Sequence, residues 1–263
     1  MLEAYLVPIA IFIVLGLVAG LLLSVASKKL AVEVDERVGK VRECLPGANC
    51  GACGYAGCDE YAVALIEKNE KINLCKPGGA VATAQIGEIL GTEAEVAERE
   101  VAFVKCNGVP SATSAKYEYK GTQTCAANNL LFSGKGSCAF GCLGFGDCIV
   151  SCEFDAIHIV NGVAKVDPEK CTACGACIKT CPKAIIALRP ISKEVKVLCN
   201  NKDKGGITRK ACTNGCIGCM KCQKTCEFGA ITVTNNVASI DHSKCTNCKA
   251  CVEVCPVKCI HLD

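Results

Sequence analysis

The feature that most constrains this chain is its cysteine content, 26 residues in a sequence of 263. Aromatic residues form only 5% of the chain, so aromatic packing contributes little to a core. Cysteines at this density form either disulfides or metal sites. In the run KCTACGACIKTCPKAI four cysteines crowd into one short loop, whereas disulfides usually join distant segments. The pattern therefore favours metal ligation.

The spacing of this run, C-x2-C-x2-C-x3-C followed by proline, favours iron–sulfur over zinc. A tetrahedral zinc site normally joins two cysteine pairs that lie a dozen or more residues apart. Bacterial ferredoxins use the observed run, and its fourth cysteine binds the other cluster of a two-cluster domain. Cys181 is therefore expected to serve a different cluster from Cys171, Cys174 and Cys177.

An internal repeat supplies the partner runs that this interpretation requires. When the sequence is shifted by 74 residues, eight cysteines between 138 and 181 align with eight between 212 and 255. Segments 156–167 and 230–241 both alternate apolar and polar residues around a short turn, which predicts a β-hairpin in each repeat. Each repeat resembles a small bacterial-type ferredoxin with two clusters.

That resemblance implies four ligand sets. In the second repeat the expected sets are Cys216, Cys219, Cys222 with Cys255, and Cys245, Cys248, Cys251 with Cys226. In the first repeat Phe145 stands where the pattern requires a cysteine, and Cys138 is the expected replacement, although the pattern fixes its role least. The expected sets there are Cys138, Cys142, Cys148 with Cys181, and Cys171, Cys174, Cys177 with Cys152.

A different motif precedes the repeats. Cys50, Cys53, Cys58 and Cys75 follow the spacing C-x2-C-x4-C-x16-C, with glycines between them that let backbone N–H groups approach the sulfurs. Residues 59–69 have helical periodicity. The segment resembles the small iron–sulfur domain found at the start of certain redox subunits. A zinc site is the alternative, because four separated thiols also satisfy a tetrahedral ion.

The N-terminal segment predicts a single transmembrane helix. Residues 4–27 carry no charge, and at 1.5 Å per residue they are long enough to cross about 30 Å of hydrocarbon. A secretory signal peptide is the alternative, but no basic residue precedes the apolar run. Because Lys28 and Lys29 follow it, we expect a single-pass protein of a prokaryotic inner (cytoplasmic) membrane. Its N-terminus would lie outside and its cluster domains on the reducing, cytoplasmic side.

Other cofactors have no visible binding motif. Neither a dinucleotide-binding glycine fingerprint nor a P-loop is present, and no complete active site is expected on this chain alone. Six cysteines remain beyond the twenty expected ligands: Cys44, Cys106, Cys125, Cys199, Cys212 and Cys259. We interpret them as buried free thiols. A further site built from pairs such as Cys106 with Cys125 stays open.

The order of these parts resembles a known family, the B subunit of the Rnf-type ion-translocating ferredoxin:NAD oxidoreductase complex. The most specific stretch is LPGANCGACGYAGC. The resemblance implies an electron-transfer subunit with five 4Fe–4S clusters that takes electrons from soluble ferredoxin. Its partners would be integral membrane and flavin-bearing subunits and membrane lipid, with no nucleic acid, and electron flow would drive sodium or proton movement. The alternatives are a donor subunit of another redox system and a zinc-stapled interaction scaffold.

The expected architecture is α+β, with a transmembrane helix, a small helical iron–sulfur domain and two tandem ferredoxin-like domains. The expected domain bounds are 1–28, 29–91, 92–190 and 191–263. Although the net charge is only +3, ten of the residues between 183 and 224 are basic and two are acidic. This segment either compensates the anionic clusters, or is simply solvated, or steers an acidic ferredoxin toward the second repeat.

Overall fold

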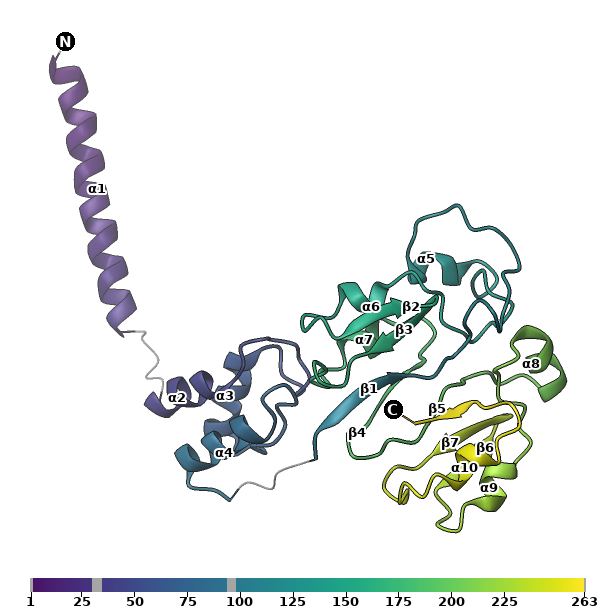
Figure 1. The fold of residues 1–263 in the computed structure, drawn as a ribbon. Helices are drawn as coiled ribbons and strands as arrows, with labels where there is room; N and C mark the ends of the chain where they lie inside the picture. The colour runs from purple at the N-terminus through teal and green to yellow at the C-terminus, as the bar shows by residue number, and fades with distance from the viewer. Residues whose placement is uncertain (1, 30–34, 94–97, 263) are drawn as a thin grey trace.

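The computed structural model describes residues 2–29, 35–93 and 98–262, with the side chains of the first helix described from residue 11 to 27. Helix α1 (Leu2–Lys29) extends away from the rest of the chain (Figure 1). Among the described residues, no helix is both long and apolar enough to span a membrane. The first part of the expected span, up to residue 10, lies outside the residues whose side chains are described.

Three helices form the domain that contains the first cysteine motif. They are α2 (Glu36–Cys44), α3 (Cys58–Glu67) and α4 (Gly79–Leu90). Their apolar faces meet in a core that contains Val41, Leu65 and Ile86, each at most 2% exposed. Buried Tyr61 donates its hydroxyl to the carbonyl of Lys71 over 2.7 Å, so the polar tip of this side chain is satisfied inside the core.

The first repeat combines two antiparallel strand pairs with short helices. Strand β1 (Glu100–Val104) pairs with β4 (Ile186–Pro190), and β2 (Ile157–Val160) forms a hairpin with β3 (Val163–Val166). Helices α5 (Cys125–Leu130), α6 (Asp147–Val150) and α7 (Ala176–Thr180) carry cysteines of the motifs or lie beside them. The apolar sides of both strand pairs face one core.

The second repeat has the same plan. Strand β5 (Lys196–Val197) pairs with β8 (Ile260–His261), and β6 (Ile231–Thr234) pairs with β7 (Val237–Ile240). Its helices are α8 (Gly205–Ala211), α9 (Lys221–Thr225) and α10 (Ala250–Glu253). Both predicted hairpins are therefore present, and their registers match: Ile157 faces Val166, as Ile231 faces Ile240.

Each hairpin turn packs on the cysteine loop of its own repeat. Gly144 and Gly218, which lie 74 residues apart, have φ angles of +75° and +65°. A Cβ atom on Gly144 would lie 2.7 Å from the carbonyl oxygen of Gly162, and one on Gly218 would lie 3.1 Å from the Cα atom of Asn236. Both the left-handed conformation and the close approach thus require glycine at these positions.

Direct hydrogen bonds join the two repeats, which lie side by side in Figure 1. The Thr213 amide donates to the Ala112 carbonyl over 2.9 Å, and the Thr113 hydroxyl donates to the Ala211 carbonyl over 2.7 Å. The Asn214 side chain donates to the carbonyl of Asn107 over 2.9 Å. These contacts hold residues 107–113 of the first repeat against the segment that follows α8.

Candidate iron–sulfur centres

Two pockets contain expected ligand sets in full. One pocket, with about 320 Å³ of space between protein atoms, is lined by Cys152, Cys171, Cys174 and Cys177. The other, with about 350 Å³, is lined by Cys226, Cys245, Cys248 and Cys251. In each pocket three cysteines come from one run and the fourth from the run that precedes it in the same repeat. In each of these two pockets the structure therefore places four cysteines from two different runs around one space.

The third pocket differs from the expectation in one residue. About 380 Å³ of space is lined by Cys142, Cys148 and Cys181, which were expected, and by Cys125, which was not. Cys138 does not line this pocket. The Asp147 carboxylate accepts hydrogen bonds from the amides of Cys125 (2.7 Å) and Ala126 (3.0 Å), so the first turn of α5 is tied to α6 beside Cys148.

Cys125 was not predicted as a ligand from the sequence. It lies outside every spaced cysteine run, on a segment with no cysteine spacing of its own, and only the fold of residues 105–137 returns it to the loop. The available signal was the missing cysteine at Phe145, which predicts a ligand from outside this run. Phe145 itself packs edge-on against Tyr119, with ring centroids 5.7 Å apart, and Lys135 lies over its ring.

The fourth set in the repeats lies around Cys222. The pKa of the Cys222 thiol is raised to about 11, mainly by burial and also by the nearby charges of Cys216, Cys219 and Cys255. Cys259 also reaches this group, because its sulfur lies 3.6 Å from that of Cys255. A hydrogen bond from the Cys259 thiol lowers the pKa of Cys216.

The N-terminal set is gathered in the same way. Burial raises the pKa of Cys75, and the charges of Cys58, Cys53 and Cys50 add to the shift. Gly51, between the first two cysteines, and Gly54, directly after the second, have φ angles of +68° and +90°, so this loop needs glycine for its backbone conformation. Cys50 also lies close enough to raise the pKa of Cys174, which is mainly raised by burial. The N-terminal domain and the first repeat therefore approach each other at their cysteine loops.

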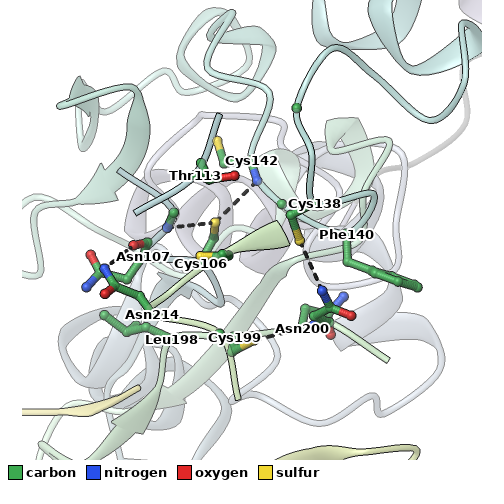
Figure 2. Close-up of a pocket in the computed structure, with 16 residues that line it drawn as sticks. Cys106, Asn107, Thr113, Cys138, Phe140, Cys142, Leu198, Cys199, Asn200 and Asn214 are labelled. Atoms are coloured by element: carbon green, nitrogen blue, oxygen red, sulfur yellow. Dashed lines mark hydrogen bonds between the residues drawn. The ribbon is translucent and has the colours of Figure 1, made fainter. Parts of the chain in front are cut away.

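Cys138 lies instead in a separate pocket between the repeats (Figure 2). Cys106, Cys199 and Cys212 line the same pocket, although nothing in their spacing along the chain groups them. Cys44 and Cys259 line none of these pockets.

A single metal ion fits none of these groups. Within residues 35–93 and 98–262, no three His, Cys, Asp or Glu side chains are close enough to bind one ion together. A cubane does not demand such convergence, because each of its four irons takes its own thiolate. Buried thiols with raised pKa values, such as Cys177 at about 12, would be protonated alone and deprotonated on binding iron.

Ferredoxin-like folding with crossed cysteine sets defines this chain as an iron–sulfur protein of the ferredoxin type. Three family models agree. Residues 45–77 match "Putative Fe-S cluster", residues 164–187 match "4Fe-4S binding domain", and residues 215–259 match "4Fe-4S dicluster domain". The expected α+β fold class and the presence of 4Fe–4S domains are thereby confirmed.

Curated relatives define the family more closely. The chain is 47% identical to the B subunit of the Na⁺-translocating ferredoxin:NAD⁺ oxidoreductase complex of Acetobacterium woodii, over all of this chain and 79% of that protein. It is 41% identical to the B subunit of the ion-translocating oxidoreductase complex of Methanosarcina acetivorans, over 97% of each. A proton-translocating counterpart from Clostridium ljungdahlii is 40% identical, over 94% of this chain and 89% of that protein. The chain belongs to this family, the B subunits of ion-translocating oxidoreductase complexes.

Proposed function

We propose that this chain is the iron–sulfur electron-transfer subunit of a membrane-bound complex that couples electron flow between reduced ferredoxin and NAD to ion translocation. The observation that carries the proposal is the gathering of cysteines into separate four-thiol groups along a ferredoxin-like fold. The names of the relatives supply the complex and its substrates. The chain itself would relay electrons, and the reaction with NAD would belong to other subunits.

Five of these groups would hold 4Fe–4S clusters, and each cluster would accept and release one electron at a time. We keep four of the five ligand sets as expected from the sequence. In the remaining set we assign Cys125 in place of Cys138, because Cys125 lines the pocket with Cys142, Cys148 and Cys181.

The cysteine contacts support a path through the clusters. The charge of Cys50 reaches Cys174, so the N-terminal cluster would lie next to the cluster on Cys171, Cys174 and Cys177. Within each repeat, one cysteine of each run would ligate the cluster that the other run holds. This exchange would keep the two clusters of a repeat close together. Electrons would enter at the second repeat and leave through the N-terminal domain toward the membrane.

The N-terminal helix is the proposed membrane anchor. The described side chains of α1 include large apolar residues that protein does not cover, such as Phe12 at 75% and Leu23 at 71% exposed. Exposed apolar residues in this density need lipid or partner helices as cover. We propose a single pass with the N-terminus outside. Protease should then release the cluster domains from inverted inner-membrane vesicles and leave them intact in spheroplasts, and the opposite pattern would reverse the topology.

Soluble ferredoxin would dock on the second repeat. Of the ten basic residues in 183–224, several have structural contacts: Lys183 donates to the Ala139 carbonyl, Arg189 to the Lys193 carbonyl, and Lys193 to the Cys245 carbonyl. The exposed remainder lies along the α8 and α9 region, beside exposed Cys219: Lys202, Lys204, Arg209, Lys210, Lys221 and Lys224. A basic surface next to an accessible cluster would speed encounter with an acidic partner.

Iron and acid-labile sulfide analysis of the anaerobically purified full chain tests the proposal. Five clusters require at least about twenty irons and twenty sulfides per chain. Substantial zinc with little sulfide would support the interaction scaffold instead.

Two matched single variants then test the revised ligand set. Cys125→Ala should damage the cluster on Cys142, Cys148 and Cys181, which would appear as a three-iron form or as the loss of about four irons. Cys138→Ala should leave that cluster unchanged by EPR spectroscopy. The reverse pattern would restore Cys138 to this set.

A further inference from the structure

The pocket between the repeats has the features of an additional cluster site. It contains about 470 Å³ of space between protein atoms, part of it open to solvent, against about 320 to 380 Å³ for the three pockets with assigned ligand sets. Cys106 and Cys138 come from the first repeat, and Cys199 and Cys212 come from the second. Figure 2 labels three of these cysteines, Cys106, Cys138 and Cys199, and shows hydrogen bonds to their sulfurs. The number and type of donors therefore match those of the other pockets.

Glycine leaves the space that a cluster would need. A Cβ atom on Gly108 would lie 3.5 Å from the Cys106 sulfur and 3.8 Å from the Cys212 sulfur. Two sulfurs from different repeats thus face the same small volume. A Cβ atom on Gly141, which also lines the pocket, would lie 3.7 Å from the sulfur of Cys138. Larger side chains at these glycines would fill the space between the thiols.

The thiols also receive hydrogen bonds, which stabilise thiolate ligands and tune clusters. The amides of Gly108 and Cys142 donate to the Cys106 sulfur over 3.4 and 3.3 Å. The amides of Asn201 and Cys216 donate to the Cys199 sulfur over 3.5 and 3.2 Å. The Asn201 side chain donates to the Cys138 sulfur over 3.4 Å.

These donors follow the internal repeat. Cys106 comes two residues after β1 and Cys199 two residues after β5. Each sulfur accepts from the amide two residues further on, and each also accepts from the amide of a cluster cysteine in its own repeat, Cys142 or Cys216. Cys138 and Cys212 correspond by the 74-residue offset. The four thiols are thus two equivalent pairs, one pair from each repeat, which is how two similar domains build a shared site.

We propose that Cys106, Cys138, Cys199 and Cys212 bind a sixth 4Fe–4S cluster, which carries electrons between the two ferredoxin units. This inference rests on the proposed electron-transfer function and extends it. With these four residues and Cys125 assigned, Cys44 and Cys259 are the cysteines left without a cluster.

The position of the site explains why a relay is needed there. Cys142 and Cys216 are proposed ligands of neighbouring clusters in the first and second repeat, and the backbone amide of each touches a sulfur of the junction pocket. The sixth cluster would take one electron from the reduced cluster on Cys216, Cys219, Cys222 and Cys255. It would pass that electron to the oxidised cluster on Cys125, Cys142, Cys148 and Cys181. Reduced ferredoxin supplies the electron, and the step involves no bond formation, bond cleavage or proton transfer.

The first test counts clusters in the anaerobically purified full chain and in three variants. Six clusters require about 24 irons and 24 sulfides per chain, and Cys106→Ala and Cys212→Ala should each lose up to about four of both or show a three-iron EPR signal. Cys44→Ala is the matched control and should keep all of them. Retention of about twenty irons in the variants shows that the other sites are folded.

The outcomes separate this inference from the proposed function. About twenty irons in the native chain, unchanged in Cys106→Ala and Cys212→Ala, would overturn the sixth cluster and leave the electron-transfer function standing. A chain without iron and sulfide would overturn both. If the native chain contained zinc and only these two variants lacked it, the junction site would hold a structural zinc ion, and the sixth cluster would be overturned.

The second test measures the relay by stopped-flow reduction with ferredoxin. In Cys212→Ala, the clusters of the second repeat should be reduced at the native rate. Reduction of the remaining clusters should slow at least roughly tenfold, because the electron must cross the gap between repeats without its intermediate. Cys106→Ala removes a junction cysteine of the first repeat and should slow the same step as Cys212→Ala does. Native rates for all clusters in both variants would show that the junction is not on the path.

Discussion

Reversing four exposed basic residues of the second repeat should slow reduction by ferredoxin steeply at low salt. Lys202, Lys204, Arg209 and Lys210 are all exposed, and they lie on α8 or immediately before it. Substituting each by glutamate changes the local charge by eight units, and none of the four residues lines the cysteine pockets described above. The variant is therefore a test of steering alone.

The size of the effect follows from Coulomb's law. Two unit charges about 10 Å apart in water interact by roughly 0.4 kcal/mol. Eight reversed units facing one charge of an acidic partner sum to roughly 3 kcal/mol, an upper limit because several residues lie further away. Since about 1.4 kcal/mol corresponds to a factor of ten, we expect a roughly 10- to 100-fold slower second-order rate near 10 mM salt. At about 0.5 M salt, where screening reaches only a few Å, the difference should shrink to a few-fold.

The assay is stopped-flow reduction of the full chain by reduced ferredoxin across a salt series. Reversal of four exposed lysines elsewhere provides the matched control, and this variant should keep most of the native rate and salt dependence: Lys40, Lys68, Lys71 and Lys120. Iron content should be equal in all three proteins. If the α8 variant reduces at the native rate with native salt dependence, this surface is not the docking site.

Three further changes test the structure directly. Asp147→Ala removes the carboxylate that accepts from the amides of Cys125 and Ala126, so the cluster that we propose on Cys125, Cys142, Cys148 and Cys181 should lose iron faster under a chelator than in the native chain. Gly218→Ala places a side chain at a φ of +65° against the hairpin turn and should lower stability by about 1–3 kcal/mol, measured by denaturation under anaerobic conditions. Burial lowers the pKa of Lys196 to about 8, so protonation is disfavoured in the folded state, and stability should rise with pH between about 8 and 10.5. Lys196→Met should abolish that rise, and a slope that persists in this variant would assign it to another group.

Local sequence determined the parts of this protein that depend on spacing. Three cysteines at x2 intervals place three thiols on one loop, whichever domain surrounds them, and the repeated runs identify the crossed partner. The hairpins follow from alternating residues and turn-forming asparagine and glycine, and their registers repeat between the two units. Because these motifs are local in sequence, their order along the chain was enough to infer the family.

Tertiary structure decided what chain spacing does not encode. Strand β1 was not expected from the sequence, because it pairs with β4 some 80 residues later and gains its stability from that partner. The choice between Cys125 and Cys138 depends on how residues 105–137 fold back on the first repeat. Grouping Cys106, Cys138, Cys199 and Cys212 required the two repeats to be joined through Thr113, Thr213 and Asn214.

The sequence by itself thus determined which cysteines form loops that suit clusters, because those ligands are close along the chain. Only the tertiary structure decided which isolated cysteines complete a pocket, since their sulfurs meet through packing between segments far apart in sequence. A cysteine outside any spaced motif gives no pattern in the sequence that identifies it as a ligand. It becomes a candidate ligand when the fold places it beside other thiols and hydrogen-bond donors around a shared pocket.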